Sequence, residues 1–400
     1  MSKSLHNKYC YYFFCCFLLE LFLGGSGQEI HITGFLTLRM INFLVGFFIG
    51  LIYLIKSRYI PVFVTSLLFC FIMLASISIA MGILNNVSLE YLFEDIKPLS
   101  YFFIIVFLYY MINSSDMASR TYQILLISGK ILVTLYLIYI LLTDILGIFD
   151  FSWAYSTFES DSFLFRGIGS AFYYKGFVFV PIAAIGFLID RKYMWFLLSA
   201  IAVYFTYTRG LYVLLFIGII VYYLAQRKVN IARIVLLIAT VYALFLLVQY
   251  LEIFQFGENY NVEREGGDEL RFLTIKQVFN SVTLFSSIFG HGFGCGVETR
   301  PVHMEMSYLE IFHKQGIMGV SFWLLVFYYV YKFTPLKKEQ SKLSDFFLIA
   351  ALLIYIQSFF NPYINNPIGM GMVLISLVSR YRLSRNENTV RNSIIQNKLI

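Results

Sequence analysis

Long apolar stretches with few charges recur along this chain of 400 residues, and they constrain its fold more than any other feature. A helix that crosses a lipid bilayer needs about 20 mostly apolar residues. The strands of a transmembrane barrel would instead alternate apolar and polar side chains over ~10 residues. The stretches here are continuous, which predicts an all-α membrane protein. Twelve segments are predicted to span the membrane: 9–23, 35–55, 60–84, 97–112, 122–146, 172–189, 193–208, 210–225, 231–251, 317–332, 345–360 and 366–380.

The composition excludes a water-soluble globule. Charged residues make up 13% of the chain and hydrophobic residues 59%, whereas a soluble domain is roughly 25% charged. No core of this length hides so much apolar surface, and the same apolar content excludes a disordered chain. The five cysteines show no Cys-x-x-Cys spacing, so neither a disulfide framework nor a zinc site is predicted.

The basic residues indicate the orientation of the spans. With the N-terminus in the cytoplasm, most lysines and arginines fall in inner loops and tails, while the short outer connections receive Lys97, Arg166 and Arg209. This is the positive-inside pattern, and it places both termini in the cytoplasm. The net charge of +7 is therefore a sign of topology and not of nucleic-acid binding. For the first segment, which ends in Gly24-Gly25-Ser26-Gly27, a cleaved signal peptide is the competing interpretation.

The topology divides the chain into consecutive regions. The predicted regions are a bundle of about nine spans (1–251), a large outer loop (252–316), the last three spans (317–380) and a basic cytoplasmic tail (381–400). In the outer loop, the apolar period from Ile275 to Phe285 predicts an amphipathic helix with Asp268 as its N-cap. The glycine-rich run 290–296 predicts a tight loop, and a second helix is predicted after Pro301, running through Gly316 into a span.

Several basic side chains at the outer face are candidates for binding an anion, because the planar fork of arginine suits phosphate oxygens. Arg209 lies where two apolar segments meet, and such a cation needs a partner or a ligand. The alternative for Arg209 is contact with lipid headgroups. Arg271 falls in the first turn of the predicted helix, where a cation is unfavourable, unless it pairs with Asp268 or Glu269. The further candidates are Arg166, Lys175 and Arg300.

Titratable side chains crowd into the stretch from His303 to Lys314. His303 and Glu305 are the acid–base candidates, and a merely solvated histidine is the alternative for the first. Glu310 and Lys314 are spaced for an i,i+4 ion pair. The intervals between His291, His303 and His313 match no metal-ligand pattern, so no metal and no other cofactor is predicted. The run 290–296 lacks the strand–helix context of a dinucleotide site.

Taken in order, these motifs resemble those of the bacterial O-antigen and capsular polysaccharide polymerases, a family related to the O-antigen ligases. The resemblance is carried by Thr206-Tyr-Thr-Arg209-Gly210, by Arg271-Phe272 followed by Ile288-Phe-Gly290-His291-Gly292, and by Glu305-Met-Ser-Tyr308-Leu309-Glu310 running to Gly316 and Gly319. Many relatives have a histidine where this chain has Glu305, and here His303 stands two residues earlier. The base is therefore left open between these two residues.

The resemblance implies the reaction and its setting. Repeat units linked to undecaprenyl diphosphate would be polymerised at the periplasmic face of the inner membrane, by transfer of the growing chain from its lipid diphosphate to a sugar hydroxyl. It implies that Arg166, Arg209, Arg271 and Arg300 hold the diphosphate, and that Glu305 or His303 is the base. His291, Tyr308 and Lys175 are candidates for other substrate contacts. A chain-length regulator protein is an implied partner besides the lipid bilayer.

Two other functions remain open. A flippase for polysaccharide repeat units would also have about twelve spans, but it should show two similar halves and charges along a central path. An O-antigen ligase would differ in its acceptor only. The sequence leaves open the sugars, their linkage, the choice between O-antigen and capsule, the choice between eleven and twelve spans, and the oligomeric state.

Overall fold

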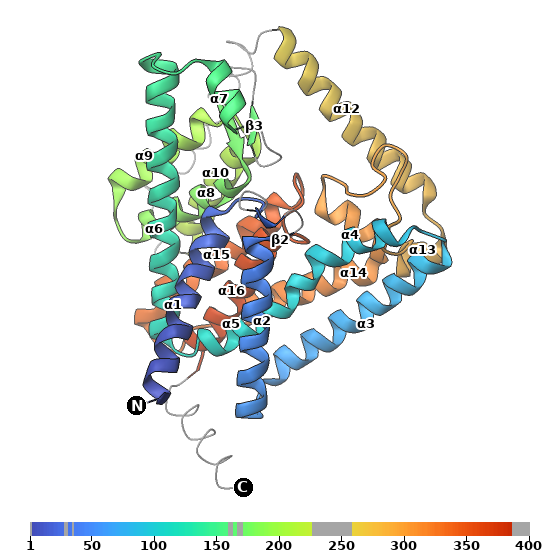
Figure 1. Cartoon of the computed structure of the whole chain (residues 1–400), viewed down its shortest axis with the longest axis horizontal. Helices are drawn as coiled ribbons and strands as arrows, with labels where there is room; N and C mark the ends of the chain where they lie inside the picture. Colours follow the sequence, from blue (N-terminus) through green and yellow to red (C-terminus); the bar gives the residue numbers. More distant parts are fainter. Residues whose placement is uncertain are drawn as a thin grey trace. The chain divides into compact units, whose positions relative to one another are not determined.

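The computed structural model describes residues 2–27, 31–33, 36–158, 163–165, 171–225 and 258–385. Most of these residues are helical (Figure 1). The helices are α1 (Ser2–Leu23), α2 (Leu38–Ser57), α3 (Val62–Leu84), α4 (Leu89–Leu99), α5 (Ile105–Met111), α6 (Ser115–Ile140), α7 (Phe151–Phe158), α8 (Phe179–Ile189), α9 (Tyr193–Phe205), α10 (Arg209–Ala225), α12 (Glu258–Ser281), α13 (Leu284–Phe289), α14 (Ser307–Lys332), α15 (Ser341–Gln357) and α16 (Pro367–Leu383).

Short elements complete the described part of the chain. Strands β1 (His31–Thr33) and β2 (Leu36–Thr37) form one antiparallel pair, and β3 (Phe163–Phe165) and β4 (Phe172–Tyr174) form another. Three 3₁₀ turns are η1 (Ser100–Ile104), η3 (Lys175–Val178) and η4 (Lys338–Gln340), and η2 (Leu141–Ile145) is a π-helical turn that continues α6.

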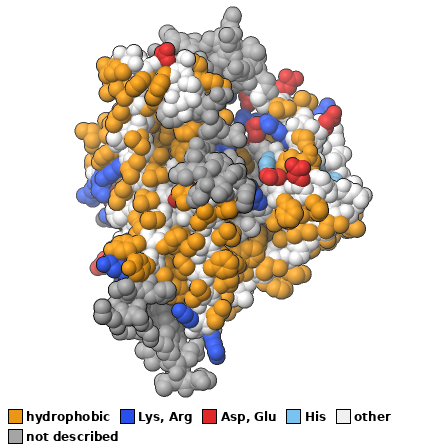
Figure 2. Space-filling view, viewed as in Figure 1, with side chains coloured by type: hydrophobic (Ala, Val, Ile, Leu, Met, Phe, Trp, Pro, Cys, Tyr) orange, Lys and Arg blue, Asp and Glu red, His pale blue; other side chains and the backbone are white. Residues whose placement is uncertain are grey.

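Three helical stretches are long and apolar enough to cross a membrane: Leu38–Ser57, Val62–Leu84 and Ser115–Ile145. Shorter apolar helices cover Lys175–Ile189, Tyr193–Phe205 and Arg209–Leu224. Apolar side chains also cover much of the face seen in Figure 2. The prediction of a helical membrane protein is confirmed, whereas the number of spans and the cytoplasmic termini remain predictions. The predicted span 231–251 lies outside the described residues.

The chain folds into two compact units, each assembled from separate parts of the sequence. Unit 1 comprises Met1–Leu18, Met40–Gln123 and Arg271–Ile400, and unit 2 comprises Leu19–Arg39 and Ile124–Leu270. The two units are defined by contacts within the fold. The four consecutive regions predicted from the sequence are defined by membrane topology instead. That consecutive division remains a prediction.

Helix α16 forms the centre of unit 1, because every residue from Ile368 to Leu383 is buried. A helix that is apolar all round is expected in such a position. Two arginines near its C-terminal end are buried as well, and both bind backbone carbonyls. Arg380 donates to the Val330 and Ser344 carbonyls at 2.6 Å each, and Arg382 donates to the Ile112 carbonyl at 2.8 Å. The Val330 and Ile112 carbonyls lie at the C-terminal ends of α14 and α5, where carbonyls lack intrahelical partners. These arginines therefore tie neighbouring elements to α16.

Unit 2 has its own buried centre in helix α8, whose residues Phe179–Ile189 are all buried. The Tyr136 hydroxyl on α6 donates to the Phe205 carbonyl at 2.9 Å, at the end of α9. Near the end of α1, the Arg39 Nε atom lies 2.9 Å from Glu20 Oε1, and both side chains are almost completely buried. A buried charge requires such a partner, so this ion pair fixes the return of the chain from α1 to α2.

Candidate functional site

A glycine loop lies between α13 and α14 in unit 1. Gly290, Gly292 and Gly294 have φ angles of 77°, 97° and 78°, which residues with a side chain rarely adopt. A Cβ atom on Gly292 would lie 2.2 Å from the Gly82 nitrogen on α3. The predicted tight loop at 290–296 is confirmed, and its glycines allow the backbone to approach α3 closely.

The same loop docks onto a break in helix α14. Gly316 has φ 62° and ψ −161°, so the helix is interrupted there. The break leaves carbonyls without intrahelical donors. The His291 N–H donates to the His313 carbonyl at 2.8 Å, and the Gly292 N–H donates to the Lys314 carbonyl at 3.0 Å. The prediction of a helix through Gly316 is therefore corrected to two helical parts joined by a kink. The first part begins at Ser307 and not directly after Pro301.

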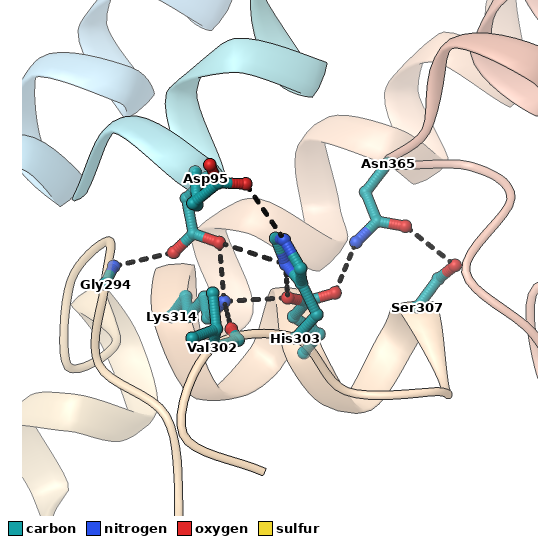
Figure 3. Close-up of polar contacts among 9 residues, drawn as sticks. Asp95, Gly294, Val302, His303, Ser307, Lys314 and Asn365 are labelled. Atoms are coloured by element: carbon teal, nitrogen blue, oxygen red, sulfur yellow. Dashed lines mark hydrogen bonds and ion pairs between the residues drawn. The ribbon is translucent and has the colours of Figure 1, made fainter. Parts of the chain in front are cut away.

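The broken helix carries a buried ammonium group, Lys314 Nζ, with three hydrogen-bond acceptors. It donates to Asp95 Oδ1 and Glu310 Oε1 at 2.7 Å each, and to the Val302 carbonyl at 2.5 Å (Figure 3). A lysine ammonium has three donors, and these three contacts use all of them. The predicted Glu310–Lys314 pair is confirmed, and Asp95 joins it as a third member. We call Asp95, Glu310 and Lys314 the buried triad.

The remaining oxygens of the buried triad also have partners. The Gly294 N–H donates to Asp95 Oδ2 at 2.6 Å, and Asn365 Nδ2 donates to Glu310 Oε2 at 2.7 Å. The Ser307 hydroxyl in turn donates to Asn365 Oδ1 at 2.9 Å. Sequence reasoning missed Asp95 and Asn365. The available signals were an acidic residue directly before the predicted span 97–112 and a polar residue following Asn361-Pro362.

Burial and charge act in opposite directions on the pKa values of the triad. Burial raises the pKa of Glu310, but the Lys314 ammonium and the His303 hydrogen bond outweigh it and lower that pKa to about 2. For Asp95, burial dominates and raises the pKa, although Lys314 opposes it. Burial lowers the pKa of Lys314, yet the two carboxylates raise it above its ordinary value. Glu310 is thus the firmly ionised partner of Lys314.

His303 extends from the preceding loop toward the buried triad. Its Nδ1 atom lies 3.4 Å from Glu310 Oε1 and 3.6 Å from Asp95 Oδ1, while Nε2 lies 3.9 Å from Glu94 Oε2. Its side chain is 49% exposed, whereas that of Lys314 is 3% exposed. The hydrogen bond to Glu310 raises the pKa of His303, against burial, which lowers it. The alternative that His303 is merely solvated is therefore wrong.

Glu305 lies between two of the predicted arginines. Arg271 Nε donates to Glu305 Oε2 at 2.6 Å, and Arg300 Nη2 donates to Glu305 Oε1. All three side chains are partly exposed, between 32% and 42%. We call these residues the arginine pair with its carboxylate. The structure thus brings three of the predicted site residues into direct contact.

The structure corrects the predicted start of the amphipathic helix. Helix α12 begins at Glu258, so Asp268 lies inside it and is not an N-cap. Arg271 is accordingly an interior residue, and the argument from an unfavourable first turn does not apply. Gly266 and Gly267 precede Asp268, and glycine in a helix interior costs about 1 kcal/mol. That bias is weak, and the helix continues through both glycines before it ends at Ser281.

The arginine pair does not include the three other predicted basic residues. Arg209 is the first residue of α10, half exposed, with Nη1 3.9 Å from Asp268 Oδ2 within unit 2. Lys175 begins the 3₁₀ turn η3, also in unit 2. Arg166 lies outside the described residues. The diphosphate role assigned to Arg209 and Arg166 stays a prediction, as does substrate contact by Lys175.

The predicted substrate contacts His291 and Tyr308 both lie in unit 1, in packed surroundings. The His291 and His313 rings are 4.5 Å apart between centroids. Burial and the neighbouring imidazole lower the pKa of His313 to about 4, and burial lowers that of His291. The Tyr308 hydroxyl donates to the Tyr355 carbonyl at 3.0 Å, so its proton is already engaged.

One group could in principle hold a metal ion. The group consists of Asp95, His303 and Glu310. In the described parts of the chain, these form the one set of three histidine, cysteine or acidic side chains whose ligand atoms all lie within 4.8 Å of one another. The Lys314 ammonium already contacts both carboxylates. A metal ion at these oxygens would have to displace a buried, fully hydrogen-bonded cation, so this donor set does not fit a resident metal.

Apolar helices of spanning length together with a charged cluster beside broken helix α14 define a helical membrane protein with a polar site outside its apolar segments. No protein-family model matches the chain. The chain is 24% identical over 404 aligned residues to a protein described as an O-antigen polymerase from Shigella flexneri, covering 97% of this chain and 98% of that protein. This match supports the O-antigen polymerase family and confirms the resemblance expected from the motifs.

Proposed function

We propose that this protein polymerises oligosaccharide repeat units into O-antigen. The observation that carries the proposal is the similarity to an O-antigen polymerase along nearly the whole of both chains. A match of that extent includes the apolar helices, the glycine loop and the charged cluster alike. The enzyme would be a membrane glycosyltransferase of the bacterial inner membrane, with its site facing the periplasm.

The donor in this proposal is a chain linked to undecaprenyl diphosphate. The hydroxyl of the terminal sugar on a second lipid-linked repeat attacks the anomeric carbon of the donor chain. A new carbon–oxygen bond forms, the bond to the diphosphate breaks, and the electron pair leaves with the diphosphate oxygen. The hydroxyl proton passes to a base on the protein.

The arginine pair suits the leaving group, because charge develops on the diphosphate oxygens as the bond breaks. Arg271 and Arg300 converge on one carboxylate, which shows that two guanidinium groups can reach the same small anion. The lipid diphosphate would bind the same two guanidinium groups beside Glu305. Arg209 and Arg166 are proposed as further diphosphate ligands, with His291, Tyr308 and Lys175 contacting other parts of the substrate.

The remaining parts of the proposal concern topology and partners. About twelve spans, cytoplasmic termini, a periplasmic loop at 252–316 and a basic tail at 381–400 would bring the site to the lipid-linked substrates. The lipid bilayer supplies both donor and acceptor, and a chain-length regulator is a proposed protein partner. Neither nucleic acid nor a cofactor has a role in this reaction.

The test is the surface-polysaccharide pattern of a strain that lacks the chromosomal gene, complemented with wild type or variants at equal protein level. The strain without the gene should show lipid core carrying a single repeat, and wild type should restore the ladder. Arg271→Ala and Arg300→Ala should leave the single repeat or a strongly shortened ladder. Arg120→Ala is the matched control, because Arg120 also pairs with a carboxylate, Asp116, but on the exposed surface of α6.

The alternatives give different patterns in the same experiment. Loss of even the single repeat in the deleted strain would support a ligase or a flippase and contradict the polymerase. A complete ladder from both arginine variants would contradict the assignment of the diphosphate site and leave the polymerase function standing.

A further inference from the structure

The two candidate bases have different surroundings in the structure, and this difference can decide between them. Both oxygens of Glu305 accept hydrogen bonds from arginine, one from Arg271 and the other from Arg300. One lone pair of each Glu305 oxygen is thereby directed at a cation. A sugar hydroxyl that hydrogen-bonds to Glu305 would have to share this carboxylate with the two arginines that the proposed function assigns to the diphosphate.

The two ring nitrogens of His303 face different carboxylates, Nδ1 the buried pair and Nε2 the half-exposed Glu94. Its Nδ1 atom faces Glu310 and Asp95, whose oxygens act as acceptors (Figure 3). The proton of the neutral imidazole therefore lies on Nδ1, and the lone pair lies on Nε2. Glu94 Oε2 lies 3.9 Å from Nε2, beyond hydrogen-bond distance. With about half of its side chain exposed, His303 can receive a hydroxyl proton at Nε2.

The charges of the buried triad favour this proton transfer. Two carboxylates and one ammonium leave one negative charge uncompensated when both carboxylates are ionised. A proton taken up by His303 places a positive charge 3.4 Å from Glu310 and 3.6 Å from Asp95. This positive charge compensates the remaining negative charge. The raised pKa of His303 has the same cause, the hydrogen bond to Glu310.

We propose that His303 is the general base of the transfer, that Asp95 and Glu310 are its positioning residues, and that Glu305 holds the arginine pair in place. This inference rests on the proposed function and specifies which side chain receives the proton. In the step, the acceptor hydroxyl loses its proton to His303 Nε2 as its oxygen bonds to the anomeric carbon of the donor. The lipid diphosphate leaves with the electron pair of the broken bond, and His303 then releases the proton to water.

The buried triad also fixes where His303 stands. Lys314 binds the carbonyl of Val302, the residue directly before His303, at 2.5 Å. The triad thereby holds both the backbone of the loop and the imidazole ring. Its members come from α4 and from the first part of α14, and the Gly294 N–H of the glycine loop completes the coordination of Asp95.

The experiment uses the purified full-length protein in lipid nanodiscs, with lipid-linked single repeats extracted from the strain that lacks the gene. Polymer formation is measured as kcat and KM. We expect His303→Gln to lower kcat by roughly 10²- to 10⁴-fold, the usual contribution of a general base. Glu305→Gln should act mainly on KM and keep kcat within about tenfold of wild type. Arg120→Ala should equal wild type.

The pH dependence separates positioning from a merely structural role. The imidazole must be neutral to accept a proton, so activity should fall at low pH with a midpoint above the ordinary pKa of about 6.5. The charged groups facing His303 are Glu94 and Asp95 from α4 and Glu310 and Lys314 from α14. Asp95→Asn removes a negative charge and should move the midpoint to lower pH. A structural role would lower activity and leave the midpoint unchanged.

The outcomes are distinct. A large loss of kcat in Glu305→Gln with a nearly normal kcat in His303→Gln would overturn the inference and leave the polymerase function in place. An unshifted midpoint in Asp95→Asn would remove the positioning role from Asp95. If wild type forms no polymer from the lipid-linked repeats, the proposed function fails, and the inference fails with it.

Discussion

The buried triad and the arginine pair with its carboxylate contain the same kinds of groups but differ in burial. Asp95, Glu310 and Lys314 are almost completely buried, and nearly every polar atom has a partner within the protein. Arg271, Arg300 and Glu305 are each about one-third exposed or more. Taking a charge out of water is costly, so a buried group tolerates no missing partner, while a half-exposed one can exchange its partner. The triad is therefore suited to hold structure, and the arginine pair is suited to bind and release an anion.

The largest effect is expected from Lys314→Met, which removes the cation from between two buried carboxylates. Breaking a buried ion pair in this way destabilises a protein by about 3–5 kcal/mol. The purified variant should show a much lower thermal midpoint in detergent, or it should accumulate poorly in the membrane. Arg120→Ala, which removes one partner of an exposed pair, should change the midpoint little. An unchanged midpoint in Lys314→Met would contradict the structural role of the triad.

The next largest effect is expected on substrate binding in Arg271→Ala. A hydrogen bond to a charged group contributes about 1.5–3 kcal/mol, so KM for the lipid-linked donor should rise by roughly 10- to 100-fold. Because the side chain is half exposed, the thermal midpoint should stay close to that of wild type. Arg271→Lys keeps the charge and loses the planar fork, and it should recover part of the affinity. A collapse in stability would place Arg271 with the buried triad instead.

A smaller effect is expected in the dependence of stability on pH. The pKa of Glu310 is lowered to about 2, so its contribution is complete above the pKa of the unfolded chain, near 4.3, and is lost as pH falls toward 2. The raised pKa of Asp95 acts in the opposite direction over part of this range. Thermal midpoints measured from pH 6 to about 3 should therefore fall in wild type and fall less steeply in Glu310→Gln. Equal slopes would show that Glu310 does not control the acid sensitivity.

The smallest effect on stability is expected from Arg209→Ala. The Arg209 and Asp268 side chains are both at least half exposed and 3.9 Å apart, and such pairs contribute about 0.2–1 kcal/mol. Polymer length in the complemented strain gives the second measurement. A shortened ladder with an unchanged thermal midpoint would support a diphosphate role for Arg209. A normal ladder would remove Arg209 from the proposed site.

The parts of the site that were predictable depend on neighbours close in the sequence. Glu310 and Lys314 are four residues apart, so helical periodicity alone brings them together. The alternating glycines at 290, 292 and 294 indicated a tight loop because they permit positive φ angles. The predicted start of α12 at Asp268 was wrong for a related reason. The bias of Gly266-Gly267 against a helix is small, and the helix forms through both residues.

The contacts that complete the site join residues far apart in the chain. Asp95 and Lys314 are separated by 219 positions, Asn365 and Glu310 by 55, and Arg271 and Glu305 by 34. No periodicity relates such residues. Each carboxylate or amide was visible as a polar residue near an apolar segment, but its partner depended on which helices pack together and on where Gly316 breaks α14.

The sequence by itself determined a helical membrane protein, the positions of most apolar helices, and a cluster of titratable residues before a late span, because these features depend on hydropathy and local spacing. The tertiary structure decided that His303 faces two carboxylates while Glu305 faces two arginines. These two side chains are only two residues apart, yet their surroundings come from different elements. The chemistry available to each depends on charge and burial, which arise only when α4, α14 and the part of α12 from Arg271 on pack within unit 1.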